Sequence, residues 1–133
     1  MSSGPTAPRR VVCVDDDEDI LQIASLALSL NQEISVETCE SGEAALALLP
    51  RVLPEFIILD VMMPGLDGPA TLARIRANPL LARIPVAFMT AMAMPREVER
   101  FMALGAVGVI PKPFDPMRLA GQVAELWRAS IAR

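Results

Sequence analysis

Four polar positions in this chain stand out because each follows a short apolar run typical of a buried β-strand. Their residue types can bind a metal ion, attack an electrophile or stabilise negative charge. If the runs form neighbouring parallel strands, the strand ends meet at the sheet edge where open α/β sheets bind ligands. In chain order the side chains are Asp15 with Asp16, Asp60, Thr90 and Lys112.

The acidic members of this set, Asp15, Asp16 and Asp60, predict a site for a divalent cation. Carboxylates about 4 Å apart repel by roughly 4 kcal/mol at an effective dielectric constant near 20, so a cation or a proton must offset their charge. Oxygen ligands without histidine or cysteine favour a hard ion, and Mg²⁺ is the expected occupant. Helix capping is the alternative for part of the acidic run, with Asp17 and Asp19 as candidates.

The same positions supply the parts of a phosphoryl-transfer site. Asp60 is a candidate nucleophile that would attack a phosphoryl group and form an acyl phosphate. Lys112 would add a fixed positive charge, and the Thr90 hydroxyl could donate a hydrogen bond to a phosphoryl oxygen. Taken singly, Thr90 and Lys112 are ordinary strand-end and loop residues, and only their placement at successive strand ends favours a functional role.

The elements that must position these residues alternate along the chain. Five short apolar runs predict strands at Val11–Val14, Ile34–Thr38, Phe56–Leu59, Val86–Met89 and Val107–Ile110. Longer amphipathic segments predict helices at Asp19–Leu30, Glu43–Leu49, Pro69–Ala77, Arg96–Leu104 and Pro116–Ile131. This alternation predicts an α/β fold with a doubly wound, five-stranded parallel sheet.

Signals at the helix ends agree with this division. Ser41 is the expected N-cap of the second helix, which Pro50 should end. Asp67 is placed to cap the third helix, and Asp115-Pro116 to begin the fifth. Gly105 is placed to close the fourth helix in a left-handed conformation.

Length and composition indicate one domain and exclude several classes of protein. The chain has 133 residues, of which 53% are hydrophobic and 21% charged, with a net charge of −4 and no basic stripe that would bind nucleic acid. No apolar run is long enough to span a membrane, and the first ten residues lack the apolar region of a signal peptide. We therefore expect a cytoplasmic protein with a disordered tail over residues 1–9 and a domain over 10–133.

The cysteine and histidine content narrows the chemistry further. Cys13 and Cys39 both lie in apolar runs and are expected to be buried thiols, with a disulfide as the less favoured alternative. The chain contains no histidine. A Ser-His-Asp site, a Cys-His site and a phosphohistidine within this chain are therefore all excluded.

Four motifs carry a resemblance to a known family: VVCVDDDEDI, IILDVMMPGLDG, PVAFMTAMA and GVIPKPFD, in this order. With this spacing the chain resembles the receiver domains of two-component response regulators from Val11 to about Ile131. The resemblance implies a flavodoxin-like (βα)5 fold with strand order 2-1-3-4-5. It also implies phosphorylation of Asp60, a switch role for the Thr90 hydroxyl and phosphate binding by Lys112.

The resemblance implies further details of the site and its partners. Mg²⁺ would be held by Asp15, Asp16 and Asp60 together with the backbone carbonyl of Met62. The Lys112-Pro113 bond is expected to be cis, as family members usually have it. A histidine kinase or a histidine phosphotransfer protein would donate the phosphoryl group. A downstream protein, or an appended effector domain, would read the surface of the fourth helix, fifth strand and fifth helix.

The sequence departs from the family pattern at two places. Many receivers have tyrosine or phenylalanine where this chain has Val109, so an aromatic switch is not expected here. Met62 and Met92 occupy positions that in the family influence how fast water removes the phosphate. We hypothesise that the two thioethers exclude water and lengthen the life of the acyl phosphate.

Two other functions remain open at this stage. A pseudo-receiver would dock partners without phosphate, although such modules typically lose one or more of the five residues that are all present here. An enzyme with an aspartyl intermediate would need a further acid or base near Asp60, and none is evident. Exposed-looking apolar residues, Met94, Met102 and Trp127, make a homodimer or partner contact plausible. Whether the receiver stands alone or belongs to a longer protein is not decided by the sequence.

Overall fold

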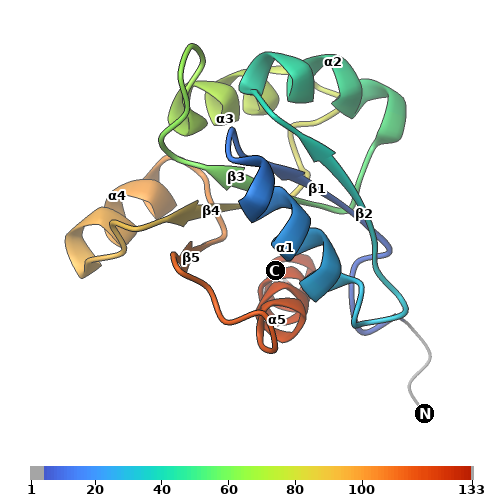
Figure 1. Cartoon of the computed structure of the whole chain (residues 1–133). Helices are drawn as coiled ribbons and strands as arrows, with labels where there is room; N and C mark the ends of the chain where they lie inside the picture. The colour runs from blue at the N-terminus through green and yellow to red at the C-terminus, as the bar shows by residue number, and fades with distance from the viewer. Residues whose placement is uncertain (1–4, 133) are drawn as a thin grey trace.

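The computed structural model describes residues 5–132, which form five strands and five helices in strict alternation. Figure 1 shows the chain passing repeatedly from the sheet to a covering helix and back. The strands are β1 (Arg10–Val14), β2 (Ser35–Cys39), β3 (Phe56–Asp60), β4 (Val86–Thr90) and β5 (Gly108–Pro111). The helices are α1 (Glu18–Leu28), α2 (Gly42–Val52), α3 (Gly68–Ala77), α4 (Pro95–Ala103) and α5 (Leu119–Ile131).

All five strands are parallel, and their order across the sheet is β2-β1-β3-β4-β5. This confirms the predicted doubly wound α/β fold and its strand order. β3 and β4 are buried along their whole length, which explains their uninterrupted apolar sequence. The order reverses after β1, so β1 and β3 are neighbours, and the ends of both strands are available to one site.

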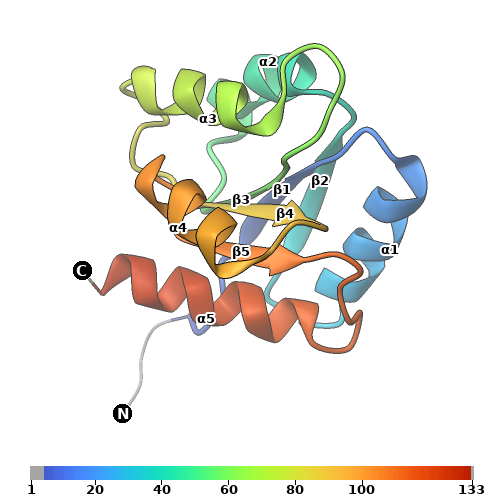
Figure 2. The ribbon, with the colours of Figure 1, turned by 90° about the vertical axis from the view of Figure 1, so that its left-hand side faces the viewer.

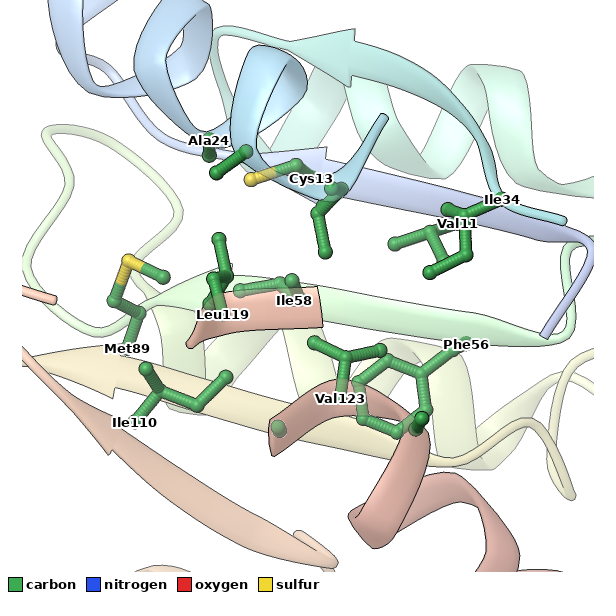
Figure 3. Packing of buried hydrophobic residues seen from close by; sticks show 14 of the residues in the cluster. Val11, Cys13, Ala24, Ile34, Phe56, Ile58, Met89, Ile110, Leu119 and Val123 are labelled. Carbon is green, nitrogen blue, oxygen red and sulfur yellow. The ribbon is translucent and has the colours of Figure 1, made fainter. Parts of the chain in front are cut away.

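The helices cover both faces of the sheet and enclose two cores. One core packs α1 and α5 against the first face, and the other packs α2, α3 and α4 against the second. Figure 2 shows the sheet between these two layers. Figure 3 shows the first core, where side chains of β1, β3, β4 and β5 meet those of α1 and α5; among them are Val11, Cys13, Ile58, Ala24, Leu119 and Val123.

Three predicted helix boundaries match the structure closely. Ser41 caps α2 by accepting a hydrogen bond from the Ala44 N–H, and Asp67 caps α3 by accepting one from the Ala70 N–H. Gly105, with φ +109°, follows the end of α4 in the left-handed region. Asp17, one of two candidates for the α1 cap, accepts hydrogen bonds from the backbone N–H groups of Asp19 and Ile20.

Two predicted helix boundaries are wrong by three residues, more than any other helix boundary. Helix α2 continues through Pro50 to Val52, because a proline in the last turn removes one hydrogen bond while Leu49 and Val52 still pack on the core. Helix α5 begins at Leu119 and not at Pro116. Asp115 instead caps the turn before the helix, where its carboxylate accepts a hydrogen bond from the Met117 N–H.

Residues 5–9 of the predicted disordered tail contact the body of the domain. Ala7 is fully buried in the first core, and the Thr6 carbonyl accepts a hydrogen bond from Arg128 of α5. Residues 1–4 lie outside the described residues, and the domain boundary at residue 10 stays a prediction. Trp127, which the sequence suggested was exposed, is also buried in this core.

Both cysteines are buried free thiols, as expected. Cys13 belongs to the first core and Cys39 to the second, so the two side chains lie on opposite faces of the sheet. This arrangement excludes the disulfide alternative in this fold. Burial is the main cause that raises the pKa of the Cys13 thiol to about 12. Within residues 5–132, no helix has the length and apolar character needed to cross a membrane.

Candidate functional site

The predicted acidic cluster forms at the carboxyl edge of the sheet. Val14 of β1 lies beside Leu59 of β3, so the residues that follow them, Asp15 and Asp60, end neighbouring strands. One carboxylate oxygen from each of Asp15, Asp16 and Asp60 lies within 4.8 Å of the other two. Asp15 and Asp60 are only 1% and 5% exposed, whereas Asp16 is open to solvent. Two buried carboxylates and one exposed carboxylate therefore line a site with access from outside.

Lys112 is the cation that this arrangement brings into contact with the buried carboxylates. Its Nζ lies 2.9 Å from Asp60 Oδ1, to which it donates a hydrogen bond, and 2.9 Å from Asp15 Oδ2. The backbone N–H of Lys112 donates to the Thr90 carbonyl, which fixes the loop after β5 against the end of β4. Burial alone would lower the pKa of Lys112, but its contacts with Asp15 and Asp60 raise the pKa above the ordinary value.

The two buried carboxylates, Asp15 and Asp60, differ in how well their oxygens are hydrogen-bonded. Burial raises the pKa of Asp60 above its ordinary value, and the hydrogen bond from Lys112 opposes that rise. Asp15 Oδ1 accepts a hydrogen bond from the Asp17 N–H, but Asp15 Oδ2 is buried without a well-aligned donor. Its contact with Lys112 is thus an ion pair with poor hydrogen-bond geometry.

This imbalance is the observation that tests whether a metal ion fits here. A buried carboxylate oxygen without a proper donor can gain a ligand, and the three acidic side chains that gather here each offer a carboxylate oxygen. Such a set suits a hard cation that retains several waters, as Mg²⁺ does. The residues therefore fit the predicted ion. A role for the Met62 carbonyl in binding it stays a prediction.

Thr90 ends β4 at the same edge and is buried. Its Oγ1 accepts a hydrogen bond from the Met92 N–H at 3.0 Å. The hydroxyl therefore keeps its own hydrogen available to donate to another acceptor. Val109 of β5 lies in register with Phe88 of β4 and is half-buried against the second core.

The loop after β3 passes very close to the candidate nucleophile. The Gly68 N–H donates to the Val61 carbonyl at 2.9 Å, and a Cβ at Gly68 would lie 2.4 Å from the Asp60 carbonyl oxygen. Gly65 in this loop has φ +74°, a conformation that favours glycine. The Lys112-Pro113 bond is cis, as the resemblance implied.

A doubly wound five-stranded sheet with an acidic cluster, a hydroxyl and a lysine at its carboxyl edge defines a class of protein, the receiver-type signalling domain. Comparison with known proteins agrees, since the family described as the response regulator receiver domain matches residues 11–124. The chain belongs to this family.

Similar proteins include both separate receivers and receivers within longer chains. The response regulator PleD of Caulobacter vibrioides is 34% identical over 122 residues, which cover 92% of this chain and 27% of PleD. The chemotaxis response regulator CheY4 of Vibrio cholerae is 30% identical with a TM-score of 0.81, and the match covers 88% of this chain and 97% of CheY4. The receiver domain of a signal transduction histidine kinase from Syntrophus aciditrophicus is also 30% identical, with a TM-score of 0.77 and 90% of each chain covered. This chain thus spans about a quarter of PleD.

Proposed function

We propose that this receiver accepts a phosphoryl group on Asp60 from a histidine kinase or a histidine phosphotransfer protein. The observation that carries the proposal is the contact of Lys112 Nζ with both Asp15 and Asp60, because it assembles a nucleophile, a fixed cation and an acidic pocket in one place. A pseudo-receiver would have no need of this set. The chain would be a phosphoacceptor rather than an enzyme with many turnovers.

The transfer would proceed by attack of the Asp60 carboxylate on phosphorus. A new bond forms between a carboxylate oxygen and phosphorus, and the bond from phosphorus to the donor's imidazole nitrogen breaks, with its electron pair leaving on that nitrogen. Lys112 stabilises the added negative charge, and the Thr90 hydroxyl donates a hydrogen bond to a phosphoryl oxygen. Mg²⁺ held by Asp15, Asp16, Asp60 and the Met62 carbonyl would neutralise negative charge during the transfer.

Signalling would follow from the movement of these two side chains toward the phosphoryl oxygens. Thr90 leads into α4, and Lys112 follows β5, so their displacement biases the surface made by α4, β5 and α5. Phosphorylation adds strong acceptor oxygens and about one further negative charge. The half-buried Val109 would repack without the aromatic rotation that a larger side chain provides.

The binding partner of this surface is also part of the proposal. A downstream protein or an appended effector domain would bind it, and a homodimer is the other possible assembly. Met94 and Met102 of this region are exposed, whereas Trp127 is buried and is therefore not part of such a contact. No role in binding nucleic acid or a membrane is proposed for this domain, and its place would be the cytoplasm.

The test is intact mass spectrometry of the purified chain with Mg²⁺ and a small acyl phosphate as donor. Wild-type protein is expected to gain a single phosphoryl group, and Asp60→Asn none, because the amide is a poor nucleophile. Addition of EDTA should suppress the gain in the wild type. A wild-type chain that stays unmodified with magnesium and donor present would overturn the proposal, and repeated turnover of donor would favour an enzyme.

We expect the lifetime of the phosphoryl group on Asp60 to depend on Met62 and Met92. The double variant Met62→Asn/Met92→Lys should lose phosphate faster than the wild type, since polar groups replace two thioethers that are expected to keep water away. Loss of phosphate can be followed by mass after removal of the donor. An unchanged rate in the double variant would disprove the hypothesis.

A further inference from the structure

Exposed methionine is concentrated near the carboxyl edge of the sheet. Met62 is 72% exposed, Met92 52%, Met94 67% and Met117 79%, whereas Met63 and Met89 are buried. Apolar side chains of this size are usually withdrawn from water, and a thioether in solvent is open to oxidation. Some methionine thioethers are thus open to oxidation at the surface, whereas others are buried away from oxidants.

Two of these methionines closely follow residues of the phosphoryl-transfer site along the chain. Met62 lies two residues after Asp60, and Met92 lies two residues after Thr90, to whose hydroxyl its backbone N–H is bonded. β3 and β4, which lead to them, are neighbours in the sheet. Met117 is at least as exposed but belongs to the turn before α5, five residues beyond Lys112. The chain therefore offers exposed thioethers two residues from the site residues Asp60 and Thr90 and others farther along the chain.

We infer that Met62 and Met92 form an oxidation site, at which a peroxide changes the life of the phosphoryl group on Asp60. In the reaction a lone pair on sulfur attacks one oxygen of hydrogen peroxide, an S–O bond forms and the O–O bond breaks. The sulfur loses two electrons, and the peroxide is reduced to water. The thioether becomes a sulfoxide, which is polar and accepts hydrogen bonds from water.

The consequence rests on the proposed function, because it requires an acyl phosphate on Asp60. Hydrolysis of that bond needs a water molecule beside the phosphorus. A sulfoxide at either position would accept hydrogen bonds from water, which a thioether does only weakly, and would hold water near the site. A single added hydrogen bond in the transition state corresponds to roughly fivefold faster loss of phosphate. Peroxide stress would then shorten the signal without altering the phosphoacceptor.

The experiment treats the chain with hydrogen peroxide, removes the peroxide with catalase, and then adds magnesium and a small acyl phosphate. Peptide mass spectrometry should find sulfoxide at Met62 and Met92 well before Met63 and Met89. After removal of the donor, the treated wild type should lose phosphate roughly fivefold faster than the untreated protein. Each variant is compared with its own untreated sample, so differences in basal rate do not enter.

Two variants separate Met62 and Met92 from the other exposed methionines. Met62→Leu/Met92→Leu keeps apolar side chains of similar size that cannot be oxidised, and its treated and untreated rates should agree. Met94→Leu/Met102→Leu/Met117→Leu, which replaces the other methionines that the structure shows as exposed, should respond to peroxide as the wild type does. Equal rates in treated and untreated wild type, or acceleration in the Met62→Leu/Met92→Leu variant, would refute the inference. If the untreated chain accepted no phosphate, the proposed function would be wrong as well. If the chain accepted phosphate but peroxide left the rate of phosphate loss unchanged, only the inference would be wrong.

Discussion

Lys112→Met in metal-free buffer is expected to unfold with a free energy about 2–3 kcal/mol below that of the wild type. Lys112 is the only cation of the described residues in contact with either Asp15 or Asp60, and both carboxylates are buried. Removing one member of a buried ion pair leaves the other charge without compensation, at a cost of roughly 3–5 kcal/mol. Because the lysine side chain is partly exposed, we expect a loss of unfolding free energy below that range. Methionine preserves the packing of the aliphatic stem.

Magnesium should reverse much of this loss. A bound divalent cation replaces the missing charge, so Mg²⁺ is expected to raise the unfolding free energy of Lys112→Met by more than it raises that of the wild type. Urea titrations with EDTA and with magnesium measure both quantities. Asp60→Asn is the matched control, since it removes one repelling carboxylate and should be at least as stable as the wild type without metal.

A Lys112→Met protein as stable as the wild type in EDTA would mean that the carboxylates are protonated or solvated rather than held by the lysine. The same result with no response to magnesium would contradict the metal site too. Equal stability in EDTA tests the ion pairs of Lys112, whereas the response to magnesium tests the metal site at Asp15 and Asp16.

The strand ends were the most predictable part of the site. Periodicity and turn residues located β1, β3 and β4, and parallel strands must present their carboxyl ends at one edge, so Asp15, Asp60 and Thr90 followed from local pattern alone. The chemistry of these residues suggested candidate roles, and the family resemblance added the specific ones, such as the switch role of the Thr90 hydroxyl. The strand order was implied by it too, because a pattern of strands and helices does not state which strands pair.

What the sequence did not reveal depends on packing between distant segments. The contact of Lys112 with Asp15 joins residues nearly a hundred positions apart. Trp127 is buried in a core that also contains Ala7, which lies in a segment with no periodic signal. The helix boundaries at Pro50 and Pro116 failed for a local reason, since proline occurs both within a last helical turn and in a turn that only precedes a helix.

Gly68→Ala is expected to lower the unfolding free energy by about 3 kcal/mol and to reduce phosphoryl uptake at Asp60. Its Cβ would lie 2.4 Å from the Asp60 carbonyl oxygen, 2.8 Å from the Val61 Cα and 3.1 Å from the Phe88 ring. The first two are backbone atoms, which cannot turn aside as a flexible side chain would. Either α3 must retreat or the end of β3 must shift, and the second movement displaces the nucleophile itself.

Gly121→Ala is the matched control, because it makes the same chemical change in α5, where a Cβ would meet nothing within 4 Å. At this exposed position in the first turn of α5, the substitution should stabilise the domain by up to about 1 kcal/mol and leave phosphoryl uptake unchanged. Thermal or urea unfolding gives the stabilities, and intact mass with a small acyl phosphate gives the uptake. If Gly68→Ala matched Gly121→Ala in both measurements, the close approach of α3 to the phosphoacceptor strand would be wrong, since no relaxation could absorb two backbone clashes without cost.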